Sequence, residues 1–253
     1  MIPEGARVLL MNHDGRKFIV EASRKMIEVP GLGVVDGTSI CDATFGDGMT
    51  VGGRRFVLLK PSVRDLLSVI ERKAQIMLPK DSFAIPMHLD IAEGSRVIEG
   101  GVGSGAMTTV LLKAVGAAGT VYSYEMREDY SALARRNISM AGLSERWELR
   151  TEDICRAKLE RNVDAAFLDI PNPWDAVSNI TNSLRPGGHL CCYMPNANQL
   201  YQAVTKMREI DLSEIHSFET LQREMVVHDG GIRPSFDMLG HTGYLAFGRK
   251  IRF

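Results

Sequence analysis

The stretch RVIEGGVGSGAMTTVLLKAVG, residues 96–116, decides the fold. RVIEG, residues 96–100, has the length and apolar content of a short buried strand, and residues 106–116 have the apolar spacing of a helix. The glycines between them, Gly101, Gly103 and Gly105, let the backbone turn sharply and approach a ligand closely. A strand, a glycine-rich loop and a helix in this order are typical of an α/β domain that binds a nucleoside-containing ligand at the loop.

Strands and helices continue to alternate on the C-terminal side of this stretch. Strands are predicted at residues 120–125, 147–151, 163–169 and 188–195, and helices at 128–141, where Gly142 is a stop signal, at 173–184 and at 196–209. Such alternation predicts a doubly wound, mostly parallel sheet with helices on both faces. The segment from residue 211 onward is β-rich without long helices, which predicts an antiparallel hairpin at one edge of the sheet.

The N-terminal part of the chain has a different pattern. Two apolar runs surround His13-Asp14-Gly15, a hairpin signal, and residues 31–43 and 50–61 continue as short β-prone pieces. Residues 62–77 then show helical spacing after a Ser62 start signal. We therefore predict a small β-rich domain at residues 1–61, a linking helix at 62–77 and the large α/β domain at 78–253.

Composition narrows the class of protein. The 253 residues are 45% apolar and 24% charged, with a net charge of −1, so the chain carries no overall basic signal for nucleic acid. The four cysteines, at positions 41, 155, 191 and 192, form no C-x-x-C pair or metal-ligand spacing, and we expect no metal site and reduced thiols. Cys191 and Cys192 are adjacent in a predicted strand and should face opposite sides of the sheet. No apolar run is long enough to span a membrane, and we expect a cytoplasmic protein.

Acidic residues follow three further strands of the predicted sheet. Glu125, Asp153 and Asp169 end the second, third and fourth strands, so all three should lie along the groove where the glycine loop lies. Glu125 is placed to accept ribose hydroxyls and Asp153 to meet an adenine edge, while Tyr130 could flank the ligand. The plainer alternatives are a solvated strand-end acid for Glu125 and a helix N-cap for Asp153.

Asp169, the third of these acids, lies in the most unusual stretch, FLDIPNPWDAV, residues 167–177. Pro171 and Pro173 restrict the backbone, so the turn that carries Asp169 is held in one conformation. Trp174 either packs under this turn or simply joins the core. The glycine loop alone does not separate a nicotinamide dinucleotide from another adenosine ligand. A rigid acid at the end of the fourth strand, Asp169, favours S-adenosylmethionine (SAM), because it would lie beside the reactive methyl group.

Together these motifs resemble the tRNA adenine-N1 methyltransferases, which modify position 58 of the T loop and, in some archaeal members, its neighbour. The resemblance covers most of the chain: PKD at 79–81, EGGVGSG at 99–105, Glu125, DIPNPW at 169–174 and HTGYL at 241–245 occur in the family's order. It implies a Rossmann-like SAM-dependent methyltransferase domain after a small all-β domain. It further implies SAM as cofactor, tRNA as substrate and a homotetramer.

The resemblance also assigns roles to single residues. Gly101, Gly103, Ser104, Gly105 and Ala106 correspond to the SAM loop, and Tyr130 lies beside it. Glu125 corresponds to the ribose acid, Asp153 to the adenine-side residue and Asp169 to the catalytic aspartate. Lys80 is the first candidate for a tRNA phosphate contact. Leu78 departs from the family pattern, which has an aromatic residue there, and Tyr193 or Tyr244 could replace it.

Three other interpretations remain open from the sequence. A SAM-dependent methyltransferase could act on a small molecule or a protein instead of tRNA. A NAD-dependent oxidoreductase would explain the glycine loop only. A non-catalytic RNA-binding subunit is disfavoured by the intact loop and Asp169. Further candidates for phosphate contacts are Arg54, Arg55, Lys60, Arg64, Arg72, Lys73, Arg135 and Arg136, each of which is also an ordinary solvated surface charge.

Overall fold

The computed structural model describes residues 1–210 and 212–251. The N-terminal part forms a four-stranded antiparallel sheet with strand order β2-β1-β6-β5 and a separate β3-β4 hairpin. One apolar cluster, which includes Val8, Phe56 and Leu58, lies inside it. The predicted hairpin around Asp14 is confirmed. The strands are β1 (Arg7–Asn12), β2 (Lys17–Glu21), β3 (Met26–Val29), β4 (Gly33–Asp36), β5 (Gly48–Val51) and β6 (Arg54–Leu59).

One prediction for this part was wrong. The stretch 31–43 is not all β, because Gly37–Asp42 form a short helix, α1, directly after β4. Asp36 begins it by accepting a hydrogen bond from the Thr38 amide, at 3.0 Å. A Cβ atom on Gly37 would lie 2.0 Å from the carbonyl oxygen of Ser23, so the chain turns at a point where only glycine fits. The β-propensity of single residues takes no account of these contacts, so it did not predict the helix.

The linking helix is shorter than predicted. Helix α2 spans Val63–Val69, with a capping box between Ser62 and Asp65, and ends at Ile70. Beyond it the chain lies against helix α6: the Glu71 amide donates to Asn137 Oδ1 at 3.1 Å, and Asn137 Nδ2 donates to the Glu71 carbonyl at 2.8 Å. Asn137 thus satisfies backbone groups that a continuing helix would have satisfied itself. Two short helices follow, α3 (Pro79–Ser82) and α4 (Ala84–His88).

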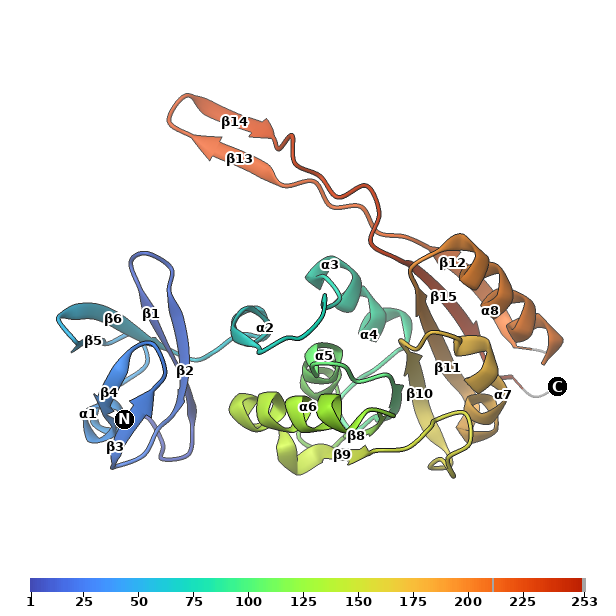
Figure 1. The fold of residues 1–253 in the computed structure, drawn as a ribbon, viewed down its shortest axis with the longest axis horizontal. Coiled ribbons are helices and arrows are strands. Elements are labelled where there is room, and N and C mark those ends of the chain that lie inside the picture. The colour runs from blue at the N-terminus through green and yellow to red at the C-terminus, as the bar shows by residue number, and fades with distance from the viewer. Residues whose placement is uncertain (211, 252–253) are drawn as a thin grey trace.

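The large domain contains a seven-stranded sheet with the order β12-β15-β11-β10-β7-β8-β9. Strands β9, β8, β7, β10 and β11 are mutually parallel, and β15 and β12 extend the sheet by antiparallel pairing (Figure 1). This confirms the doubly wound sheet with an antiparallel edge. The remaining elements are β7 (Arg96–Gly100), α5 (Ala106–Ala114), β8 (Thr120–Tyr124), α6 (Glu128–Ala141), η1 (Ser144–Arg146), β9 (Trp147–Arg150), β10 (Val163–Leu168), α7 (Pro173–Ser183), β11 (Leu184–Met194), α8 (Ala197–Glu209), β12 (Ser213–Phe218) and β15 (Tyr244–Arg249).

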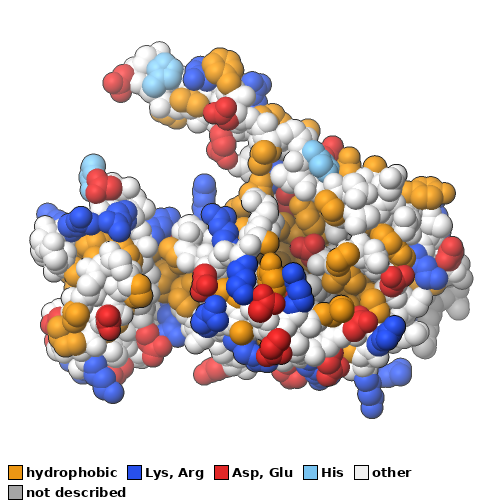
Figure 2. Space-filling model, in the orientation of Figure 1, with side chains coloured by type: hydrophobic (Ala, Val, Ile, Leu, Met, Phe, Trp, Pro, Cys, Tyr) orange, Lys and Arg blue, Asp and Glu red, His pale blue; other side chains and the backbone are white. Residues whose placement is uncertain are grey.

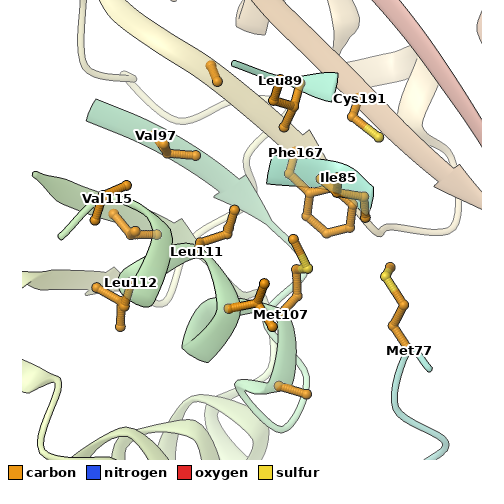
Figure 3. Close-up of a cluster of buried hydrophobic side chains, with 14 of the residues drawn as sticks. Met77, Ile85, Leu89, Val97, Met107, Leu111, Leu112, Val115, Phe167 and Cys191 are labelled. Atoms are coloured by element: carbon orange, nitrogen blue, oxygen red, sulfur yellow. The ribbon is translucent and has the colours of Figure 1, made fainter. Parts of the chain in front are cut away.

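Apolar side chains cover both faces of this sheet. On one face, α4 and α5 pack against the strands through residues such as Ile85, Leu111 and Phe167 (Figure 3). On the other, α7 and α8 contribute Ile180 and Met207. Cys191 belongs to the first cluster and Cys192 to the second, both fully buried, as their adjacent positions in a strand predict. Burial on both faces fixes the register of the central strands and hence the edge where the site lies.

The connection between β12 and β15 forms a protruding arm. Strands β13 (Met225–His228) and β14 (Gly231–Pro234) pair only with each other and stand clear of the body (Figures 1 and 2). The sequence did not indicate that this hairpin would leave the sheet. Among the described residues, no helix has the length and apolarity needed to cross a membrane.

Candidate active site

The glycine loop follows β7 and opens α5, as its sequence context predicts. Gly101, Gly103 and Gly105 have φ values of +82°, +54° and +80°, a region that other residues rarely adopt. The Gly101 amide donates to the Tyr124 carbonyl at 2.9 Å, which joins the loop to the end of β8. A Cβ atom on Gly101 would lie 2.0 Å from the Asp169 carbonyl oxygen, so the loop also packs directly on the turn after β10.

Glu125 lies at the end of β8, nearly buried, beneath the same loop. Its Oε2 accepts hydrogen bonds from the Val102 and Gly103 amides, both at 3.1 Å, and its Oε1 accepts one from the Arg127 amide at 3.1 Å. A carboxylate has about four lone-pair sites, so Oε1 keeps capacity for one further donor. Glu125 therefore holds the loop in place and can still accept a hydrogen bond from a hydroxyl group of a ligand.

Asp169 begins the proline-containing turn after β10. Its amide donates to the Gly100 carbonyl at 2.8 Å, which places the side chain at the end of β7, beside the loop. Desolvation, and then the charge of Glu125, raise the pKa of Asp169 to about 6. The residue has accessible surface because it faces an open cavity. The protein atoms around it nevertheless displace much of its hydration, which raises its pKa, while the solvent in the cavity screens its charge.

Two cavities meet at these residues. The smaller, about 190 Å³, is lined by the glycine loop, by residues 74–77 and by Tyr130. The larger, about 540 Å³, is lined by the ends of β8 and β10 and by residues 152–155. Gly101, Glu125, Arg127 and Asp169 line both, so the two cavities form one groove across the carboxyl ends of the parallel strands.

The two remaining predicted ligand residues lie at opposite ends of this groove. Asp153 lines the larger cavity, where its Oδ1 accepts from the Cys155 amide at 2.9 Å and leaves Oδ2 toward Arg156. Tyr130 lines the smaller cavity, with the Arg127 guanidinium 3.6 Å from its ring centroid. Ser104 and Ala106 also line the smaller cavity. The structure thus brings the residues predicted for the cofactor to this groove, except Gly105, which packs toward Ala134 and Ile138 of α6.

Sequence reasoning missed two contributors. Ala74, Gln75, Ile76 and Met77 line the smaller cavity because α2 ends early, and nothing in their helical spacing predicted this. Glu99 is the second: it is fully buried in β7, and its Oε2 accepts from the hydroxyls of Thr108 and Ser123 at 2.8 and 2.5 Å.

The environment of Glu99 favours its neutral form. Burial raises its pKa to about 8, the two hydroxyl donors oppose this rise, and the charges of Asp169 and Glu125 add to it. Its Oε1 is buried without a hydrogen-bond partner. The sequence contained one clue: Glu99 is a single acid within the apolar run of a predicted central strand, and a buried acid there needs a reason.

Lys80 has protein partners in this structure. Its ammonium donates to both oxygens of Asp81, at 2.8 and 3.0 Å, to the carbonyl and hydroxyl of Thr220, and to Thr242 Oγ1 at 2.7 Å. The side chain is 9% exposed and that of Asp81 is fully buried. This network ties α3 to the two chain segments at the base of the arm. The geometry favours a positioning role, and the phosphate contact stays a prediction.

The residues considered as replacements for an aromatic group at Leu78 lie near this network. The Tyr193 hydroxyl donates to the Thr242 carbonyl at 2.9 Å, and Tyr244 packs against His241 with ring centroids 4.5 Å apart. Leu78 itself lines a separate cavity at the base of the arm, together with Lys80 and Phe83. Among residues 1–210 and 212–251, no group of three or more His, Cys, Asp or Glu residues is arranged to hold a metal ion.

Comparison with known proteins agrees with this architecture. Residues 56–233 match the family described as the tRNA methyltransferase complex GCD14 subunit. A protein from Methanocaldococcus jannaschii, named tRNA (adenine(57)-N(1)/adenine(58)-N(1))-methyltransferase TrmI, is 32% identical over 95% of this chain and 94% of its own length.

Two solved structures are similar over the whole chain. A SAM-dependent O-methyltransferase from Thermotoga maritima has a TM-score of 0.82 and 35% identity, covering 100% of this chain and 95% of that one. The tRNA (m1A58) methyltransferase TrmI from Aquifex aeolicus has a TM-score of 0.76 and 28% identity, covering 100% and 99%. These matches confirm the family predicted from the motifs: the chain belongs to the family of the tRNA methyltransferase complex GCD14 subunit.

Proposed function

We propose that this protein transfers the methyl group of SAM to N1 of adenosine 58 in the T loop of tRNA. One observation carries the proposal: Asp169, on a turn stiffened by two prolines, lies where both cavities of the groove meet. The relatives from M. jannaschii and A. aeolicus are named for this reaction.

The groove fits SAM by the chemistry of its walls. Glu125 has a free acceptor site for a ribose hydroxyl, and Asp153 lies on the wall of the larger cavity where an adenine would bind. The glycine loop offers close backbone approach in the smaller cavity, which suits the methionine part. When bound, SAM supplies an electrophilic methyl group on a sulfonium centre.

In this proposal, Asp169 acts on the adenine base that receives the methyl group. Adenine N1 carries an in-plane lone pair, so it needs no strong base, but methylation leaves a positive charge on the base. A fixed carboxylate in a partly desolvated site stabilises a cation that develops in the transition state. Asp169 can also accept a hydrogen bond from the exocyclic amino group and so orient the base. Because N1 is engaged in pairing within folded RNA, the base must also be exposed, which costs a few kcal/mol.

We infer that the protein forms a homotetramer, as the resemblance to the family implies, and the exposed arm supports self-association. Val227 pairs with Ile232, and Met225 with Pro234, on one face of the hairpin, where Val227 and Ile232 are 73% and 67% exposed. An isolated two-stranded hairpin is marginally stable in water, and an apolar face this exposed needs a cover. A second copy of the chain would provide it, and cytoplasmic tRNA would be the substrate of the assembly.

The alternative is a SAM-dependent methyltransferase with a different acceptor, favoured by the O-methyltransferase name of the T. maritima structure. Labelled SAM should be incubated with the enzyme and an unmodified tRNA transcript, and in parallel with a transcript carrying guanosine at position 58. Label on the first transcript only supports the proposal. Label on both keeps tRNA as substrate but moves the site, and no label with SAM still bound shifts the assignment to another acceptor.

A further inference from the structure

A second groove lies between the N-terminal domain and the large domain, near the C-terminal end of α5. It has a cavity volume of about 610 Å³, and its walls include Arg7, Phe45 and Lys60 on one side and Lys113, Ser144 and Glu145 on the other. Lys113 lies seven residues after Ala106, about 10 Å along the helix from the loop. The groove is therefore separate from the candidate active site.

Two lysines that line this groove, Lys60 and Lys113, lie near a third cation, Arg146. Desolvation, and then the charges of Lys60 and Arg146, lower the pKa of Lys113. In the part of the chain that the structure describes, none of the three forms an ion pair within 4.0 Å, although many other Lys and Arg residues do. The Nε atom of Arg146 is buried and has no hydrogen-bond partner.

The carboxylates near the groove do not neutralise this cluster. Glu21 lines the groove but is paired with Arg7. Glu145 also lines it, so two unpaired lysines on the wall, with Arg146 nearby, face one unpaired acid. Like charges held together are unfavourable, and a buried guanidinium N–H without an acceptor adds a desolvation cost. An anion with several acceptor oxygens, bound between Lys60 and Lys113, would relieve the repulsion among these cations.

We propose that Lys60 and Lys113, with the charge of Arg146 nearby, bind a backbone phosphate of the tRNA substrate in this interdomain groove. The proposal rests on the proposed function, because it identifies how the same substrate is held. An open groove bordered by two domains suits a chain that passes through it. Contacts to phosphates fix the position of a nucleic acid without reading its sequence. Because the cluster is remote from Asp169, it should affect the binding of tRNA and leave the methyl-transfer step unchanged.

The test uses the full-length protein and the double variant Lys60→Gln/Lys113→Gln, which leaves the partly buried Arg146 untouched. A matched variant, Lys25→Gln/Lys206→Gln, removes two charges from exposed or half-exposed positions elsewhere. For each protein, tRNA affinity is measured over a series of salt concentrations. KM and kcat for methyl transfer, SAM affinity and thermal unfolding are measured alongside.

The groove variant should lower the slope of log affinity against log salt by about 1 and raise KM for tRNA about tenfold. Its kcat, SAM affinity and unfolding temperature should match the wild type, and the matched variant should behave as wild type throughout. An unchanged slope and KM would overturn the proposal. So would a site that only binds inorganic phosphate, seen as a phosphate-dependent thermal shift lost in the variant while tRNA affinity is kept. Failure of the wild type to methylate tRNA would instead remove the proposed function, and this inference with it.

Discussion

Gly101 and Asp169 are locked together: the left-handed backbone of the glycine packs on the carbonyl of the aspartate, which a Cβ atom at 101 would approach to 2.0 Å. The loop that borders the cofactor groove and the turn that bears the proposed catalytic acid are thus one rigid unit. Such close packing positions a functional group more precisely than a free loop would.

Gly101→Ala should disrupt this unit. The φ of +82° is unfavourable for alanine, and the clash with the Asp169 carbonyl adds overpacking, for a total loss of about 2–4 kcal/mol in unfolding free energy. The comparison variant is Gly103→Ala, where φ is +54° and a Cβ would meet nothing within 4 Å, so about 1 kcal/mol is expected. Urea unfolding measures both. Equal losses would show that the contact between Gly101 and Asp169 has no special weight.

Methyl transfer should depend on pH through Asp169. Its pKa is raised to about 6, so the carboxylate that stabilises the cation is lost as the pH falls through about 6. We expect kcat/KM to rise with pH around this value and then level off. Folding responds in the opposite direction: between pH 3.8 and about 6 the folded state holds the extra proton, so stability declines slightly as the pH rises. A profile that is flat between pH 5 and 7 would contradict the role of Asp169.

Glu99→Gln should stabilise the protein at high pH. The folded-state pKa of Glu99 is raised from 4.5 to about 8, so the wild type loses stability as the pH rises through that window and the buried group ionises. Glutamine keeps the shape and an acceptor for the Thr108 and Ser123 hydroxyls, and it does not ionise. Unfolding free energies of both proteins, compared at pH 5 and pH 9, should be similar at pH 5 and higher for the variant at pH 9. A variant less stable at pH 9 would mean that the charged form is the native one.

Lys80→Met tests the position of Lys80 in the network below the arm. Removing one member of a buried ion pair leaves Asp81 uncompensated and should cost about 3–5 kcal/mol in unfolding free energy. Lys80→Met/Asp81→Leu should recover part of this loss, since it removes both charges. If Lys80 instead contacts a tRNA phosphate, the single variant would fold normally and show a reduced salt dependence of tRNA binding.

The sequence predicted the central sheet well because its signals are local. The strand at 96–100, the glycine loop and the helix that ends at Gly142 each follow from their own residues, and the structure contains all three. The alignment of Glu125, Asp153 and Asp169 along one groove followed from sheet topology alone.

The errors arose where distant contacts override local preference. The linking helix stops at Ile70 because Asn137, 66 residues from Glu71, binds the backbone of the next residue. Likewise, the partners of Lys80 come from Thr220 and Thr242, more than 100 residues away, so its burial could not be read from the PKD motif. The groove that Lys60 and Lys113 line could not be predicted either, because these two residues are distant in the sequence.

The most direct test of the account is the activity of Asp169→Ala and Asp169→Asn on tRNA, with SAM affinity measured on the same proteins. Asparagine keeps the size of the side chain and one acceptor oxygen but removes the negative charge. In both variants, SAM affinity should stay within about tenfold of wild type, and methyl transfer should fall at least about 100-fold, the scale of losing one charge-stabilising group. Full activity in either variant would contradict the central role of the Asp169 carboxylate.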